Sequence, residues 1–174
     1  QSGSDRILRG MRRGYDRAGY LELVARLRAA VPGVALTTDL IVGFPGETEE
    51  DFAATLALAE EVGFDGAFTF IYSPRRDTEA ARLPDRVDHA VAEERMHRLV
   101  GVIQERARER NQALLGQTVE VMVERTSRQH PGEVMGRTRT HKPVNFPSSA
   151  RPGDFVLVAL LEATSTSFRG RQTS

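Results

Sequence analysis

The most constraining feature of the sequence is a β-rich run that passes into a glycine- and proline-containing turn and then into a helix. Residues 34–42 are mostly apolar or β-branched and hardly alternate, which is typical of a parallel strand covered on both faces. After the turn at 43–46, Thr48 and the acidic residues that follow predict a helix start, and Gly63 predicts its end. A second apolar run at 67–72 completes a βαβ unit, whose strands we expect to be parallel.

Helices are predicted on both sides of this unit. Ile7, Leu8 and Met11 at helical spacing indicate a short helix, and a second helix is expected from about Asp16 to Ala30. Residues 73–87 read as a loop, because prolines and charges interrupt any periodicity. Apolar residues then recur every three or four positions over 88–115, which predicts one long helix ending at Gly116.

The last third of the chain has a different texture, with short β-like runs separated by Pro-Gly turns. The runs cover 118–124, 134–138, 143–146 and 155–161. We therefore predict two domains with a boundary at 116/117. Residues 1–116 form an α/β part, and residues 117–174 form a small all-β barrel.

The composition excludes several classes of site and leaves others open. The chain has no cysteine, so it contains no disulfide, no thiol nucleophile and no cysteine-held iron–sulfur cluster, and its four histidines lack the spacing of a metal motif. No apolar run is long enough to cross a membrane, and we expect a soluble, cytoplasmic protein. The chain starts without a methionine, and we expect it to begin within a longer protein. The net charge is zero, yet residues 117–174 contain eight basic and five acidic residues.

The first candidate site lies where the strand at 34–42 ends. In parallel βα folds, ligands bind at the carboxyl ends of the strands, and Gly43 and Gly46 allow a ligand to approach the backbone. The helix after the turn directs free N–H groups toward it, which favours an anionic or polar small molecule. A turn that merely connects two elements is the alternative. Asp39 is a charged residue in an apolar strand and needs a partner there, either in a structural hydrogen bond or in the pocket.

A series of motifs in this order resembles the latter half of the radical S-adenosylmethionine (SAM) domain of methylthiotransferases. The motifs are Gln1-Ser2-Gly3-Ser4-Asp5, Met11-Arg12-Arg13, Thr38-Asp39-Leu40-Ile41-Val42-Gly43-Phe44-Pro45-Gly46-Glu47-Thr48 and Phe68-x-Phe70-x-Tyr72-Ser73-x-Arg75. Further motifs resemble the small RNA-binding TRAM barrel of the same enzymes, namely Gly136-Arg137-Thr138-Arg139, Val144-x-Phe146, Pro152-Gly153-Asp154 and Ser167-Phe168-Arg169-Gly170. The resemblance implies the C-terminal half of a partial (β/α) barrel followed by a TRAM-like barrel.

Within that family, the motifs resemble the branch that modifies adenosine 37 of tRNA. The resemblance implies addition of a 2-methylthio group to N6-isopentenyladenosine, with SAM and two 4Fe-4S clusters as cofactors and the tRNA anticodon arm as partner. The cluster cysteines of the family lie outside this chain, so we expect the chain to be inactive alone, with no metal ligand and no catalytic residue of its own. Residues expected to line the SAM pocket are Gln1, Ser2, Ser4, Asp39, Gly43, Phe44, Pro45, Gly46, Tyr72 and Arg75.

The barrel supplies the residues expected to bind RNA. They are Arg137, Arg139, Lys142, Arg169 and Arg171 for phosphates and Phe146 or Phe168 for stacking on a base. A merely solvated basic rim is the alternative. Two other functions stay open, a non-catalytic RNA-binding or adaptor protein and a methylthiotransferase for N6-threonylcarbamoyladenosine. One departure from the family is Asp77, where a glycine is usual, so the turn there is expected to differ. The oligomeric state is not determined by the sequence.

Overall fold

The computed structural model describes residues 1–127 and 130–173 and contains two compact units. They comprise Gln1–Ile103 and Gln104–Ser174, so their division falls inside one long helix. The predicted boundary at 116/117 lies further along the chain and stays a prediction. No helix among the described residues is both long enough and apolar enough to cross a membrane.

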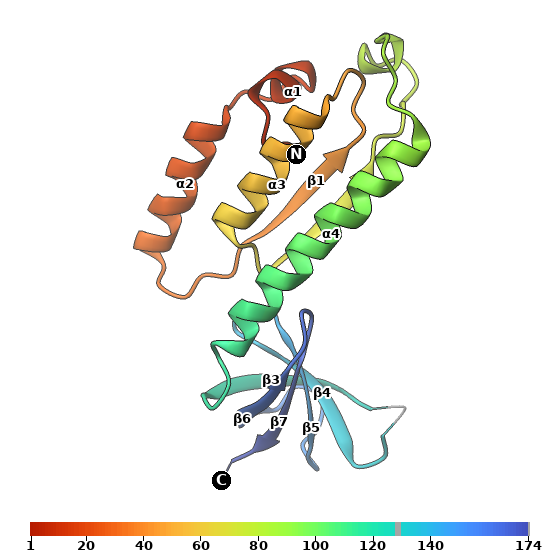
Figure 1. Ribbon diagram of the computed structural model, residues 1–174. Helices are drawn as coiled ribbons and strands as arrows, with labels where there is room; N and C mark the ends of the chain where they lie inside the picture. The colour runs from red at the N-terminus through yellow and green to blue at the C-terminus, as the bar shows by residue number, and fades with distance from the viewer. Residues whose placement is uncertain (128–129, 174) are drawn as a thin grey trace. The chain divides into compact units, whose positions relative to one another are not determined.

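The first unit contains two helices followed by a strand–helix–strand unit and a long helix (Figure 1). They are α1 (Asp5–Gly10), α2 (Arg17–Ala30), β1 (Thr37–Val42), α3 (Glu49–Val62), β2 (Gly66–Ile71) and most of α4 (His89–Gln112), with a short 3-10 helix η1 (Ala80–Arg82) before α4. The expected elements are all present. The loop at 73–87 contains η1, which the sequence pattern did not predict.

Side chains at the ends of α3 explain its limits. The Thr48 hydroxyl accepts a hydrogen bond from the Asp51 backbone N–H, and the Asp51 carboxylate accepts one from the Thr48 N–H, which together form a capping box. Gly63 ends the helix with a φ of 56°, a left-handed conformation in which glycine has no Cβ penalty. The predicted start and end of this helix are therefore confirmed.

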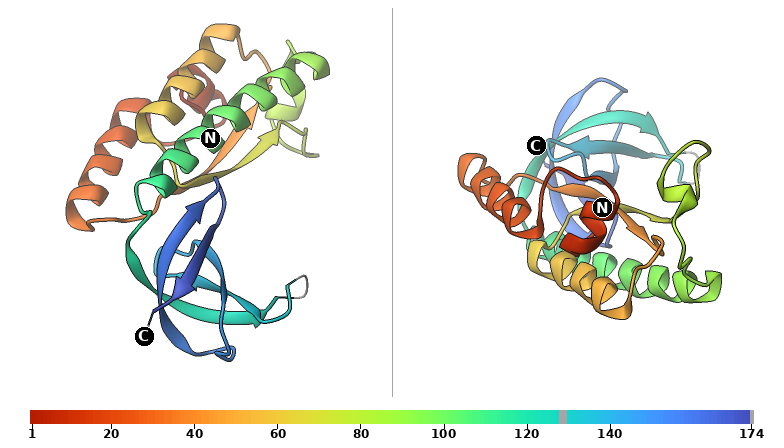
Figure 2. Two further views of the ribbon diagram at one scale, coloured as in Figure 1. Left: turned by 60° about the horizontal axis from the view of Figure 1, so that its bottom comes forward. Right: turned by 90° about the horizontal axis from the view of Figure 1, so that it is seen from above.

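β1 and β2 form a two-stranded parallel sheet, with Asp39 opposite Phe68 and Ile41 opposite Phe70. Leu40 and Val42 pack in a core cluster with residues of α3 and α4. Figures 1 and 2 show these two helices on the same side of the sheet. The opposite face is open within this chain, and Phe68 and Phe70 are 69% and 51% exposed there. The prediction that β1 is covered on both faces is therefore wrong for the residues described.

The second unit is a closed five-stranded barrel in the order β3-β4-β5-β7-β6. Its strands are β3 (Thr118–Thr126), β4 (Glu133–Thr138), β5 (Pro143–Pro147), β6 (Phe155–Ala163) and β7 (Phe168–Gln172). The predicted small barrel is confirmed, although the sequence pattern missed β7. Inward-facing side chains fill the interior as one core cluster consisting of Val121, Val123, Val134, Val144, Phe146, Val158, Leu160 and Phe168.

Candidate functional site

The loop after β1 uses its own backbone N–H groups internally. Gly43 and Gly46 have φ values of 74° and 78°, and both therefore occupy conformations that favour glycine. The Gly43 N–H donates to the Glu47 carboxylate at 2.8 Å, and the Gly46 N–H donates to the Asp85 carbonyl at 2.8 Å. The capping box pairs the N–H groups of Thr48 and Asp51 in the first turn of α3. A ligand site at this helix end stays a prediction, with fewer backbone N–H groups available than the sequence suggested.

A buried ion pair fixes this loop to α4. The Glu47 and Arg95 side chains are 0% and 6% exposed, and their Oε2 and Nη1 atoms are 2.9 Å apart. Nη1 of Arg95 also donates to the Glu47 carbonyl at 3.1 Å. Burial raises the pKa of Glu47, while the hydrogen bonds from Gly43 and Arg95 oppose that rise. Together these contacts hold the loop in one conformation against the helix.

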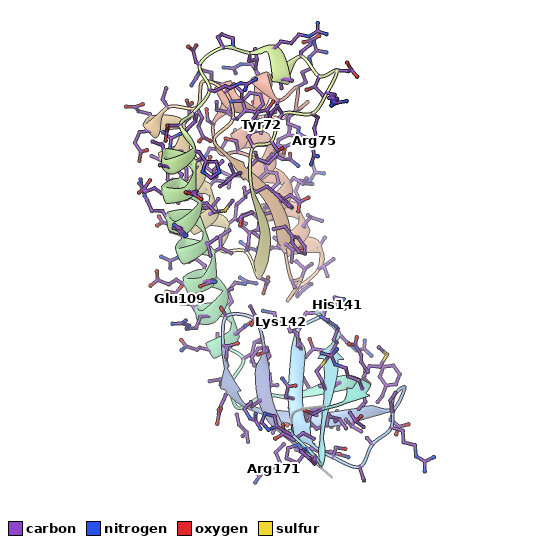
Figure 3. All side chains as sticks on the ribbon, turned by 90° about the vertical axis from the view of Figure 1, so that its right-hand side faces the viewer. Tyr72, Arg75, Glu109, His141, Lys142 and Arg171 are labelled. Carbon is purple, nitrogen blue, oxygen red and sulfur yellow. The ribbon has the colours of Figure 1, made fainter. Side chains whose placement is uncertain are left out.

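A cavity of about 490 Å³ lies beside the carboxyl ends of the strands. Ile41, Phe44, Tyr72 and Arg75 line it, and the rings of Phe44 and Tyr72 meet edge to face with their centres 5.2 Å apart. The hydroxyl of Tyr72 is buried and has no hydrogen-bond partner among the described residues. Figure 3 shows Tyr72 and Arg75 at the same end of this unit. An unpaired buried hydroxyl in a cavity wall is a position at which a polar ligand can bind.

Residues from two other segments complete the rim of the cavity. They include Arg12 and Arg13 after α1 and Asp77 and Glu79 before η1, and Arg12 and Glu79 form an ion pair. Arg12 and Asp77 have φ values of 57° and 66°, which side chains other than glycine rarely adopt. Asp77 therefore occupies the left-handed conformation for which a glycine is best suited. The expectation that the turn differs from the family's stays a prediction.

Ser2 and Ser4 do not line the cavity, although both were predicted to face SAM. Both are buried, with Ser2 Oγ 3.1 Å from Thr55 Oγ1 and Ser4 Oγ donating to Asp51 at 2.6 Å. Burial favours a higher pKa for Asp51, but hydrogen bonds from Arg6, Ser4 and Thr48 outweigh it and hold the pKa well below its usual range. These serine hydroxyls connect the N-terminal segment to α3.

Gln1 and Asp39 lie beside or within β1. The Gln1 carbonyl accepts from the Ile41 N–H at 3.0 Å, and its side-chain oxygen accepts from the Tyr15 hydroxyl at 2.9 Å. Asp39 is exposed, and the described residues provide no hydrogen bond or ion pair to its carboxylate. The expectation of a structural partner for Asp39 rested on burial, which the open face of the sheet removes. Gly43 and Pro45 line a second, smaller cavity of about 110 Å³ with Tyr72.

The predicted RNA-binding arginines lie on the outside of the barrel. Arg137 pairs with Glu124 at 3.0 Å, Arg139 pairs with Glu120 at 3.1 Å, and Arg169 pairs with Glu133. Arg171 is exposed on β7, and Figure 3 shows it on the barrel, well separated from His141 and Lys142. Three of these arginines are therefore each paired with a different glutamate, which partly neutralises their charge.

Three other predicted RNA contacts are buried. Phe146 and Phe168 are 0% and 1% exposed in the barrel core, so neither ring is free to stack on a base, and this prediction is wrong. Lys142 is also buried, and its ammonium group donates to the side-chain oxygen of Asn111. The exposed aromatic residue of the barrel is Phe155, at the start of β6, which sequence reasoning did not select.

The residues of this chain do not fit an iron–sulfur cluster. The sequence has no cysteine, and the described residues contain no group of three His, Cys, Asp or Glu side chains that could hold a metal ion. SAM is a different case, because the cavity at Tyr72 offers an unpaired hydroxyl, an aromatic wall and guanidinium groups. Glu47 and Arg95 were missed as site residues, since a buried ion pair across 48 positions leaves no local sequence signal.

Comparisons with known proteins agree with the two-unit architecture. Residues 1–59 match the radical SAM superfamily, and residues 112–172 match the TRAM domain. A tRNA-2-methylthio-N(6)-dimethylallyladenosine synthase from Moorella thermoacetica is 52% identical over 171 residues, which is 98% of this chain and 38% of that protein. Synthases of the same name from Clostridium botulinum and Nitrosospira multiformis are each 48% identical, over 99% and 98% of this chain and 38% and 36% of their own lengths. The chain thus spans less than two fifths of the length of these relatives, and its sequence combines a match to the radical SAM superfamily with a match to the TRAM domain.

Proposed function

We propose that this chain is part of an enzyme that adds a 2-methylthio group to N6-isopentenyladenosine at position 37 of tRNA by SAM-dependent radical chemistry. The observation that carries the proposal is the identity of 52% to a synthase of that name, which extends through both the cavity unit and the barrel. In this proposal the first unit supplies part of the SAM pocket. The barrel holds the tRNA.

The cavity at the ends of β1 and β2 is the proposed SAM site. When bound, SAM supplies the methyl group and the radical. The Tyr72 hydroxyl is available to hydrogen bond to a polar group of the cofactor, and the Arg75 guanidinium suits a carboxylate. Phe44 provides an apolar wall that keeps water out, and the Glu47–Arg95 pair keeps the loop that carries Phe44 in place.

The remaining residues predicted for the SAM pocket are proposed to contribute in two ways, by direct contact or by indirect support. Gln1 and Asp39 lie along β1, next to the open face of the sheet, where a ligand has access to them. Ser2 and Ser4 support the site indirectly, because their hydroxyls fix the N-terminal segment to α3.

The partner proposed for the barrel is the anticodon arm of tRNA, in the cytoplasm. The match to the TRAM domain and the excess of basic residues in this part of the chain support it. Arg137, Arg139, Arg169 and Arg171 are the proposed phosphate contacts, since all four lie outside the barrel core.

The cofactor site is tested by SAM binding to the longest natural protein that contains this sequence, with its clusters reconstituted. Tyr72→Phe removes only the unpaired hydroxyl and should weaken SAM binding about five- to tenfold, equivalent to about 1 kcal/mol. Tyr20→Phe is the matched control, because Tyr20 packs against the cluster of Val24, Leu58, Val62 and Phe64, away from this cavity. Equal SAM affinity of both variants and the unmodified protein would place SAM elsewhere.

A second function is favoured by one observation, the match of residues 112–172 to the TRAM domain, because that match does not depend on a cluster. A non-catalytic RNA-binding protein would need the barrel but no cluster. Nucleoside analysis of tRNA after reaction with the longest natural form distinguishes the two, with this chain alone as the inactive control. Formation of the 2-methylthio product supports the enzyme. RNA binding without any product supports the binding protein.

A further inference from the structure

The outer surface of the barrel carries an apolar strip composed of Met122, Phe155 and Leu157, which are 38%, 64% and 50% exposed. Met122 and Phe155 are directly opposite each other on the antiparallel strands β3 and β6. Leu157 lies two positions further along β6, so all three side chains project from the same face. The intervening residues face inward, which makes this strip a fixed feature of the barrel.

Arginines occupy the strands on both sides of the strip. Arg137 on β4 is the cross-strand partner of Met122, so Arg137, Met122 and Phe155 form one row across three strands. On the other side, β7 pairs with β6, and Arg171 is opposite Ala159, the next outward residue after Leu157. Phosphates on either flank of the strip would therefore meet a guanidinium group.

Both basic and acidic side chains border the strip. Arg139 is 85% exposed and donates to Glu120, which is the partner of Leu157 on β3. Arg137 pairs with Glu124, and the exposed Asp154 directly precedes Phe155. Arg171 on the other flank is exposed, so guanidinium groups border the strip on both sides.

The first unit contains a second pair of exposed aromatic residues that provides an internal comparison. Phe68 and Phe70 project from the open face of the β1–β2 sheet, and the charged residue in register with Phe68 is Asp39. A carboxylate there repels phosphate, whereas the barrel strip is bordered by guanidinium groups. Charge complementarity therefore assigns a nucleic acid to the barrel strip and not to the sheet.

We infer that the strip binds unpaired nucleotides of RNA, with a base stacked on Phe155 and phosphates held by the flanking arginines. Aromatic rings on β-barrels bind single-stranded nucleic acid in this way, because every base has a face that can stack. The inference rests on the proposed function, in which the barrel holds tRNA, and it identifies the surface that does so. It replaces Phe146 and Phe168, whose rings are in the core.

The test compares substitutions of Phe155 in the 174-residue chain, using a fluorescein-labelled RNA hairpin with an unpaired adenosine loop as the probe. Phe155→Ala should weaken binding by roughly tenfold or more, as expected for the loss of one stacked base. Phe155→Trp should preserve binding. Phe155→Leu separates the two kinds of contact, because it keeps an apolar side chain but removes the stacking ring. Phe68→Ala, at an equally exposed phenylalanine, should leave the affinity unchanged.

The dependence of affinity on salt adds an independent signature. Arg171→Ala should reduce the slope of log K against log salt by about 0.7, the value for one phosphate contact with a single strand. Phe155→Ala should lower affinity without changing that slope. Arg26→Ala, at an exposed arginine of α2, is the control for a general loss of positive charge.

The outcomes separate this inference from the function on which it rests. If the unmodified chain binds the hairpin and Phe155→Ala binds equally well, the strip is not the RNA site, while the proposed function survives. Full binding by Phe155→Leu also overturns base stacking, because an apolar contact with the RNA is then sufficient. If the unmodified chain binds no RNA at all, the RNA-binding role of the barrel in the proposed function fails as well.

Discussion

The barrel and the two-stranded sheet differ in the burial of their phenylalanine side chains. In the barrel, Phe146 and Phe168 point inward and are buried, because closure gives every strand two neighbours and encloses one face completely. In the two-stranded sheet, Phe68 and Phe70 are exposed, because α3 and α4 cover the opposite face. The same residue type in a strand thus contributes to a core in one unit and to an accessible surface in the other.

Because of this difference, the two units offer different kinds of surface for binding a ligand. The barrel is closed and its interior is filled by side chains, which leaves its outer surface for a ligand. The first unit has an open sheet face and a cavity at the strand ends, where Tyr72 offers an unpaired hydroxyl. In the proposed function, the small molecule therefore binds to the first unit and the polymer to the second.

The largest effect expected from the comparison is on stability. Phe146→Ala should lower the free energy of unfolding of the barrel by about 3 to 5 kcal/mol, because it leaves a cavity in a closed core. Phe68→Ala should cost less than about 0.5 kcal/mol, since its ring is already exposed. Urea denaturation with hydrogen exchange read separately for each unit measures both. Similar losses for the two variants would mean that the open face is covered in solution.

Removing one partner of the buried ion pair should cause a comparable loss of stability in the first unit. Arg95→Met leaves the buried Glu47 carboxylate without its partner and should destabilise this unit by about 3 to 5 kcal/mol. Adding Glu47→Gln to Arg95→Met should recover much of that loss, because it removes the unpaired charge. If the double variant is no more stable than Arg95→Met, packing of the arginine and not its charge holds the loop.

Low pH should reduce the stability of the first unit, because it protonates Asp51. Its pKa is lower in the folded state than its ordinary value of 3.8, so its stabilising effect is complete above about pH 4 and declines as the pH falls below that value. Asp51→Asn should cost about 2 kcal/mol at neutral pH and should remove this part of the acid sensitivity. Denaturation from pH 7 to pH 2 measures both effects. An unchanged acid profile in Asp51→Asn would assign the sensitivity to other carboxylates.

The smallest effect is expected at the rim of the cavity. Arg12 and Glu79 form an ion pair with both side chains largely exposed, at 74% and 70%. Arg12→Ala should therefore change stability by less than about 1 kcal/mol, and the change should shrink further in high salt. A larger loss that persists in high salt would show that packing of the arginine side chain, and not the ion pair, holds the rim.

Much of the fold follows from sequence periodicity and turn chemistry. Thr48, Asp51 and Gly63 define α3 because capping depends on residues within one helical turn. The strand β7 was missed, since Phe168–Gln172 is short and carries two arginines and a glycine. Burial of β1 on both faces was overpredicted, because a run of apolar residues does not reveal whether a second layer is present.

The candidate site was harder to predict than the fold. Tyr72, Phe44 and Arg75 were selected by their motifs, and the structure brings them to one cavity. Ser2 and Ser4 were placed in the same pocket, but the Thr55 and Asp51 side chains bind their hydroxyls. These partners lie about 50 positions away in the sequence, so only the tertiary structure reveals them. In the barrel strands, alternate side chains face outward and inward, so Phe155 is exposed and Phe146 is buried. The sequence alone did not show which of the two sets of side chains in each strand faces the core.

The central claim, that this sequence contributes to 2-methylthio modification of tRNA, is tested most directly by nucleoside mass spectrometry of tRNA from cells. We predict that deleting the gene for the longest natural protein that contains this sequence removes 2-methylthio-N6-isopentenyladenosine and leaves its unmethylthiolated precursor. The unaltered gene should restore the modification, and a Tyr72→Phe allele should restore less of it. An unchanged level of the modified nucleoside after deletion, or loss of the threonylcarbamoyl derivative instead, would contradict the claim.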